Sequence, residues 1–253
     1  MELQDIKLRP KFFIDNLDLL NLETQISIIG MSGSGKDTQA KLANEKLISM
    51  GRNSAHLGSG IIFEKMSRSE YTNKEEAMFL LQTEFARSNS AEVKNSGTML
   101  SNSFIYNVYA GALQVYNPEV VFNVGFERNF EQVQIPVQFF KSLQEDAKRR
   151  PKFFKKNILR TAIYLELEEE ECRKRIKARA ELLNRPDDAS DTAVDKRILR
   201  DKNEIGIVLG AMQAYGVSVM KIKCNPTDTI EETNERIFPL ILQAVQIGQG
   251  LNI

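Results

Sequence analysis

The sequence predicts an α/β protein in which a five-stranded parallel sheet is covered by helices on both faces. Short apolar or β-branched runs recur along the chain, and longer helical patterns separate them. This alternation is typical of a parallel sheet, because each return to the same edge needs a crossover helix. Ligands of such sheets bind beyond the carboxyl ends of the strands. The predicted strands are 25–29, 54–57, 120–124, 162–167 and 217–222.

A glycine-rich loop over residues 30–38 follows the first strand. Gly30, Gly33 and Gly35 have no side chains, so the backbone can curl until successive N–H groups point into one concavity. The concavity lies at a helix N-terminus, where partial positive charge favours phosphate. Lys36 adds a full charge that reaches toward the β- and γ-phosphates of a nucleotide. The segment therefore predicts a phosphate-binding loop.

The helix that follows this loop is predicted from Ala40, Ala43 and Leu47, which repeat at helical spacing until Gly51 supplies a stop. Between the second and third strands, residues 61–116 are expected to be mostly helical. We expect one large domain over 25–248, preceded over 1–24 by an arm or helix that packs on the core.

Composition excludes several function classes. Lys plus Arg is 34 and Asp plus Glu is 34, so charge gives no argument for nucleic acid or for a membrane surface. No segment is long and apolar enough for a membrane span, and the polar start is not a signal peptide. We expect a cytoplasmic monomer. Cys172 and Cys224 are interpreted as free core thiols and His56 as structural, so zinc and Ser-His-Asp chemistry are not expected.

Four segments, in order along about 25–237, resemble adenylate kinases and other nucleoside monophosphate kinases. Residues 30–43 resemble the family's phosphate loop, whose lysine is commonly followed by Gly-Thr-Gln. Residues 56–60 resemble the stretch that receives the acceptor nucleotide, and 122–128 resembles the strand end Asp-Gly-Phe-Pro-Arg. Residues 175–197 are similar to the short lid of uridylate–cytidylate kinases and cytosolic adenylate kinases.

The resemblance implies a fold of the P-loop NTPase type and a transferase of nucleotide metabolism. The reaction would move a phosphoryl group reversibly from Mg-ATP to a nucleoside monophosphate. The acceptor would bind at a helical insertion over 58–116, and the lid region would be 175–197. The implied cofactor is Mg²⁺, and the implied partners are ATP and the acceptor.

The resemblance also implies roles for individual residues. Phosphoryl transfer spreads negative charge over oxygens that must be held in line, so cations and backbone donors do nearly all of the work. Arg128 would hold the acceptor's phosphate, and Arg175 would stack on the donor adenine. The implied catalytic residues are Lys36, Arg128, Arg179, Arg185 and Arg197. The implied ATP-binding residues are Gly30, Ser32, Gly33, Ser34, Gly35, Lys36, Asp37, Thr38 and Arg175.

The acceptor is expected to be AMP. Gln132 follows Arg128 by four residues, where adenylate kinases carry a glutamine that hydrogen-bonds the base, and its amide matches adenine's edge. UMP, CMP or a deoxynucleoside monophosphate is the alternative acceptor, and a catalytically degenerate nucleotide-binding protein is the alternative function. The implied acceptor-binding residues are Ser59, Gly60, Gly125, Arg128 and Gln132.

The chain departs from the family's pattern at three places. Glu64 stands where the family has a phosphate-binding arginine, and Lys65 or Arg68 is a replacement close by. Val124 stands where an acid helps to organise Mg²⁺, and Asp37 follows the loop lysine. We hypothesise that the metal-organising carboxylate has moved to Asp37. The alternative is that Asp37 only complements the helix dipole.

Overall fold

The computed structural model describes residues 21–70, 72–73, 75–77, 79–80, 83, 102–134, 137, 158–183 and 190–250, without the side chains of residues 63, 64, 66, 67, 103 and 106. Four predictions fall wholly or partly outside this description. They concern the arm before residue 21, the helical insertion between residues 84 and 101, the lid residue Arg185 and the side chain of Glu64.

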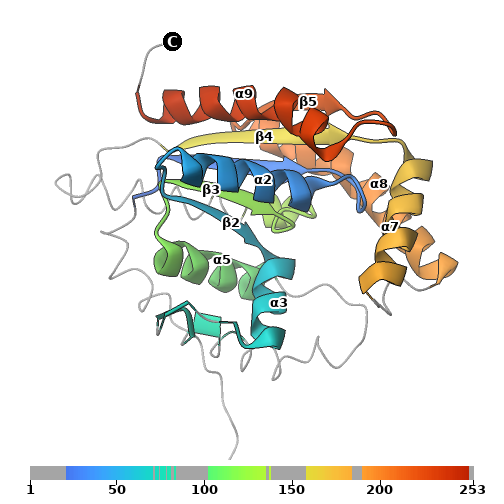
Figure 1. The fold of residues 1–253 in the computed structure, drawn as a ribbon, viewed down its shortest axis with the longest axis horizontal. Coiled ribbons are helices and arrows are strands. Elements are labelled where there is room, and N and C mark those ends of the chain that lie inside the picture. Colours follow the sequence, from blue (N-terminus) through green and yellow to red (C-terminus); the bar gives the residue numbers. More distant parts are fainter. Residues whose placement is uncertain are drawn as a thin grey trace, which may run out of the picture.

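A five-stranded sheet, parallel throughout, forms the centre of the molecule (Figure 1), with the strand order β2-β3-β1-β4-β5. All five predicted strands are confirmed, with bounds that shift by at most a few residues at either end. The strands are β1 (Thr24–Ile29), β2 (Ser54–Gly58), β3 (Val120–Val124), β4 (Leu159–Glu166) and β5 (Ser218–Lys223).

Helices pack on both faces of the sheet (Figure 1). Ile28 of β1 lies in an apolar cluster with Leu47 of α2 and Ile241 of α9. Ile29, the next residue, points to the opposite face and packs with Met212 of α8, and α5 covers the same face. The described helices are α2 (Lys36–Ser49), α3 (Ser59–Arg68), α5 (Asn102–Tyr116), α7 (Glu169–Leu183), α8 (Asp191–Ala214) and α9 (Ile230–Gly248).

The face of β1 toward α5 and α8 also carries polar side chains, which are satisfied within the core. Gln25 Nε2 donates to Glu127 Oε1 at 3.3 Å, and Arg160 Nε donates to Gln25 Oε1 at 3.0 Å. Burial raises the pKa of Glu127, against the effect of Ser27, Arg160 and Gln25. Because buried polar groups are costly without partners, this network joins β1, β4 and the segment after β3 in one arrangement.

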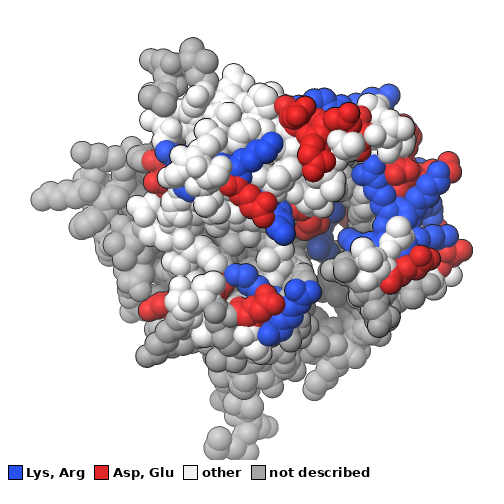
Figure 2. All heavy atoms as spheres, in the orientation of Figure 1, with Lys and Arg blue, Asp and Glu red and all other residues white. Residues whose placement is uncertain are grey.

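Helix α7 begins with acidic residues, which stabilise its N-terminus. The same residues pair one turn along the helix, as in Arg173 with Glu169 and Lys174 with Glu170. Figure 2 shows the resulting mixture of basic and acidic side chains over α7 and α8, at the right of the view. Within the described part of the chain, no helix combines the length and the apolar character that crossing a membrane requires.

Candidate functional site

The glycine loop, residues 30–38, leaves the carboxyl end of the central strand β1 and enters α2. Gly33 and Gly35 have φ of +85° and +88°, the left-handed region that favours glycine. A Cβ on Gly33 would also lie 2.5 Å from the carbonyl oxygen of Cys172, whereas one on Gly35 would meet nothing within 4 Å. The loop is therefore pressed against the first turn of α7, and only a glycine fits at position 33.

A cleft of about 1450 Å³ opens beside this loop. The end of β3, the start of α3, and helices α7 and α8 line its other sides. The loop between β5 and α9 closes the cleft through residues such as Asn225 and Thr229. Predicted site residues that line it are Gly30, Ser32, Gly33, Ser34, Gly35, Lys36, Asp37, Thr38, Gly60, Gly125, Arg128, Arg175, Arg179 and Arg197.

Lys36 extends back along the loop. Its Nζ donates a hydrogen bond to the carbonyl oxygen of Met31 at 3.3 Å. Burial lowers the pKa of Lys36, and Arg128 and Arg179 lower it further, whereas Asp37 and Asp201 oppose the shift. The lysine thus lies among charges of both signs, and its burial makes an anionic ligand at this place favourable.

Arg128 projects into the cleft from the turn after β3. Its Nε donates to the carbonyl oxygen of Gly125 at 3.0 Å, and a Cβ on Gly125 would come within 3.0 Å of Nη2. Burial lowers the pKa of Arg128, and among the neighbouring like charges Arg200 lowers it most. We name five side chains the cation cluster: Lys36, Arg128, Arg179, Arg197 and Arg200.

Asp37 and Asp201 are the carboxylates that interact with both Lys36 and Arg128. In this group the cations outnumber the carboxylates. Because like charges close together repel each other, such an arrangement favours a ligand that carries several negative charges. Nucleotide polyphosphates have this property.

Arg175 lies at the mouth of the cleft, next to the β5–α9 loop. Its Nε donates to Glu171 Oε1 at 2.9 Å, and its Nη2 reaches the carbonyl oxygen of Pro226 at 3.4 Å. The planar guanidinium is therefore held between α7 and that loop. Such a surface is suited to stacking on an aromatic base.

Two predicted acceptor residues do not line the cleft. Gln132 is only 3% exposed, and its Oε1 accepts a hydrogen bond from the backbone N–H of Arg128 at 3.0 Å. Gln132 thus caps a turn instead of facing a ligand, because Asn129 begins a helical turn and accepts from the N–H of Gln132 at 2.8 Å. Ser59 is also buried, and its hydroxyl donates to the carbonyl oxygen of Gly125 at 3.2 Å.

The two candidate replacements for the missing arginine differ in their surroundings. Lys65 Nζ lies 2.6 Å from Glu76 Oε1 and 3.3 Å from the hydroxyl of Tyr116. Burial would raise the pKa of Glu76, but hydrogen bonds from Lys65, Thr72 and Tyr116 lower it to about 2. Lys65 thus forms an ion pair with the buried carboxylate of Glu76. Arg68 also lines the cleft, with a side chain that is 60% exposed and lies 3.9 Å from Glu70 Oε1.

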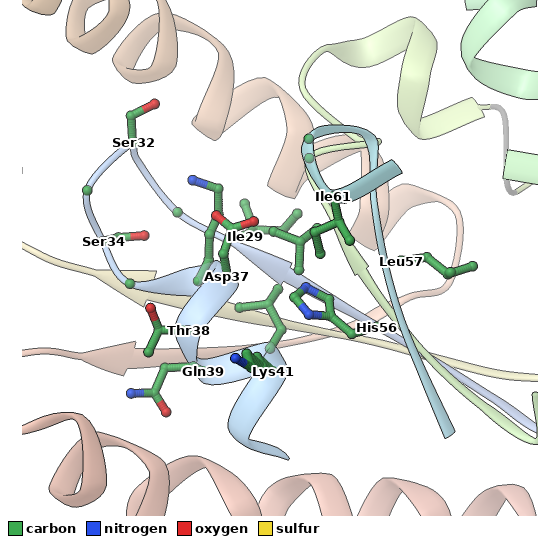
Figure 3. Close-up of a pocket in the computed structure, with 18 of the residues that line it drawn as sticks. Ile29, Ser32, Ser34, Asp37, Thr38, Gln39, Lys41, His56, Leu57 and Ile61 are labelled. Carbon is green, nitrogen blue, oxygen red and sulfur yellow. The ribbon is translucent and has the colours of Figure 1, made fainter. Parts of the chain in front are cut away.

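Figure 3 shows the side of the cleft between α2 and β2, where Asp37 and Lys41 lie near His56. Burial lowers the pKa of His56 to about 4, so the imidazole is neutral at neutral pH. His56 was predicted to have a structural role. In the structure it lines the cleft and carries no charge.

A magnesium ion fits this site only as a companion of phosphate. Asp37 is exposed and lines the cleft, and Val124 offers no ligand. Among the described residues, no group of three or more metal-ligating side chains occurs. Mg²⁺ in proteins is commonly held by one or two carboxylates together with substrate phosphates and waters, so the single carboxylate of Asp37 is compatible with that arrangement.

Sequence reasoning missed Arg200 and Asp201 of α8, which also line the cleft. A signal was present, because Arg197, Arg200, Asp201 and Glu204 are spaced along one face of a helix. Nothing in that spacing told which face would meet the glycine loop.

The comparisons with known proteins identify no family. None of the family models matches the chain, and no curated protein sequence matches it. Any function proposed for the chain therefore depends on the chemistry of the cleft and on the residues of the chain itself.

We predict that Gly33→Ala destabilises the protein more than Gly35→Ala does. Both substitutions place a side chain at positive φ, but only the first also places a Cβ against the Cys172 backbone. The additional loss of unfolding free energy should be about 1–3 kcal/mol, the usual cost of overpacking. Chemical denaturation of the two variants without nucleotide measures it. Equal losses would contradict the close contact between the loop and α7.

Proposed function

We propose that the protein is a nucleoside monophosphate kinase of the P-loop NTPase type, which transfers the γ-phosphoryl group of Mg-ATP to a nucleoside monophosphate. The observation that carries this proposal is the cation cluster, which faces a glycine loop at the end of a central parallel strand. The four segments that resemble adenylate kinases support it, since most of their matching arginines line the same cleft.

In the proposed reaction, the loop N–H groups and Lys36 bind the β- and γ-phosphates of the donor. Arg128 holds the acceptor's phosphate, whose oxygen attacks the γ-phosphorus. A new P–O bond forms to the acceptor, and the bond from the γ-phosphorus to the bridging oxygen breaks, leaving ADP with its electron pair. Arg179 and Arg197 stabilise the charge on the transferred group.

Asp37 is the proposed protein ligand of Mg²⁺. When bound, the metal neutralises charge on the donor phosphates and holds them in one orientation. A carboxylate beside a triphosphate would otherwise be repelled, so its exposed position at the start of α2 makes most physical sense with a cation between the two.

The proposed acceptor is AMP, and UMP, CMP and deoxynucleoside monophosphates are the other candidates. The first experiment is a coupled assay of ADP formation with ATP, Mg²⁺ and each of these acceptors, set beside direct measurement of nucleotide binding. A second candidate function is nucleotide binding without turnover, and Val124 favours it because an apolar side chain lines the cleft where the family has an acid. Binding without transfer to any acceptor would select that function.

We predict that Lys36→Met lowers turnover on the order of a hundredfold or more, because it removes a charge that stabilises the transition state. The midpoint of thermal unfolding should change little. Lys41→Met is the matched control, since Lys41 lies on the same helix, lines the cleft and is 72% exposed. Undiminished transfer in Lys36→Met would reject the role of the glycine loop.

We predict that Gln132→Ala raises the KM of every acceptor by a similar factor, because the side chain supports the backbone of Arg128 and does not face the base. Gln134→Ala is the control, since Gln134 lies two residues further on and donates to the hydroxyl of Tyr215. Steady-state rates with AMP, UMP and CMP measure the effect. A loss confined to AMP would show instead that Gln132 reads the base.

For the metal, we predict that Asp37→Gly abolishes Mg²⁺-dependent turnover and that adding Val124→Asp restores part of it. Glu45→Gln, which removes a different cleft carboxylate of α2, should leave the Mg²⁺ dependence unchanged. Rates measured across a Mg²⁺ titration decide this. Wild-type dependence in Asp37→Gly would leave Asp37 with only its effect on the helix dipole.

A further inference from the structure

The carboxylate of Asp201 is bonded to the glycine loop from across the cleft. Its Oδ2 accepts a hydrogen bond from the backbone N–H of Ser32 at 2.7 Å. Its Oδ1 accepts from Arg200 Nη2 at 2.9 Å and from Arg200 Nε at 3.3 Å. The side chain of Asp201 is 16% exposed. Burial would raise the pKa of Asp201, but the bonds from Ser32 and Arg200 outweigh it and hold the pKa below its usual value.

The carboxylate of Asp201 acts on cations from two parts of the cleft. Asp201 is among the charges that act on both Lys36 and Arg128. One of these cations belongs to the loop, and the other lies at the end of β3, where the acceptor's phosphate is proposed to bind. A group transferred from donor to acceptor must pass through the space between them. The carboxylate of Asp201 therefore acts on the cations at both ends of that space.

We propose that Asp201 is an internal anion that the outermost phosphate of the donor displaces, and that it thereby sets how strongly the site discriminates between triphosphate and diphosphate nucleotides. The inference rests on the proposed function in taking the loop as the donor phosphate site. One N–H of Ser32 cannot bond fully to both a carboxylate and a phosphate, and the two anions repel each other at short range.

The binding of ATP requires displacement of Asp201, and the binding of ADP does not. Two phosphates can occupy the end of the loop at the N-terminus of α2, where the helix dipole and Lys36 act. A third phosphate extends toward Arg128 and meets Asp201. ATP therefore binds only after the hydrogen bond between Asp201 and the N–H of Ser32 has broken, whereas ADP leaves that bond in place. When Asp201 is displaced, Arg200 also loses a partner and can turn toward the added phosphate.

Another role for the same bond is possible on chemical grounds, and it predicts the opposite result. If Asp201 organises the loop for nucleotide, its removal weakens the binding of every phosphate ligand. A purely long-range effect of its charge would change the affinities of ATP and ADP together. The ratio of the two affinities separates these roles from displacement.

The test is isothermal titration of wild-type protein, Asp201→Asn and Glu204→Gln with ATP and with ADP, in EDTA so that no metal bridges carboxylate and phosphate. Asp201→Asn should bind ATP about tenfold more tightly, which corresponds to about 1.4 kcal/mol, and should change ADP binding less than about threefold. Glu204→Gln removes another carboxylate of the same helix and the same cleft, so it should change both affinities by similar small factors.

Weaker ATP binding by Asp201→Asn, or equal gains for ATP and ADP, would overturn the proposal. If Asp201→Asn unfolds, Asp201→Ser is titrated in its place. Tripolyphosphate and pyrophosphate are titrated in parallel as ligands without a nucleoside. Tight ATP binding with no transfer to any acceptor would refute the kinase and leave this inference standing. If neither wild type nor variant binds any of these ligands, both proposals fail.

Discussion

The contact between the backbone of Gly33 and the carbonyl oxygen of Cys172 is the constraint on which the site depends. It leaves no space for a side chain and fixes the glycine loop against the first turn of α7. Because α7 carries Arg175 and Arg179, the same contact sets where these arginines stand relative to the loop. The loop directly follows β1, and helices pack against both faces of that strand. The sheet and the helices packed on it thus position the glycine loop and the cations around one cleft.

Charge then determines what this cleft can bind. Burial is the main cause that lowers the pKa values of Lys36 and Arg128, and neighbouring arginines add to the effect. Two carboxylates, Asp37 and Asp201, offset part of this charge. Such a group gains most from a ligand that brings several negative oxygens. Within this group, Lys36 donates a hydrogen bond to the carbonyl oxygen of Met31, and Asp201 accepts one from the N–H of Ser32.

The sequence predicted the parts of the fold that depend on local pattern. The five strands and the glycine loop follow from apolar runs and from glycines that need positive φ, which are short-range properties. Contacts between distant segments could not be predicted. The bond from Ser32 to Asp201 joins residues 169 positions apart, and the pair of Lys65 with Glu76 depends on how α3 packs. Gln132 has the spacing from Arg128 that predicted a base-binding side chain, but this side chain is buried and accepts a hydrogen bond from the N–H of Arg128. Spacing along the chain does not determine that orientation.

Hydrogen–deuterium exchange with and without ATP and Mg²⁺ tests most directly the claim that the glycine loop and the cation cluster form a polyphosphate site. ATP should slow exchange of the backbone amides in residues 32–38, whose N–H groups would bond to phosphate, and it should change exchange in α8 around Arg200, which contacts Asp201 in the free protein. Exchange that ATP leaves unaltered in the loop, at a concentration that saturates binding, would contradict the account.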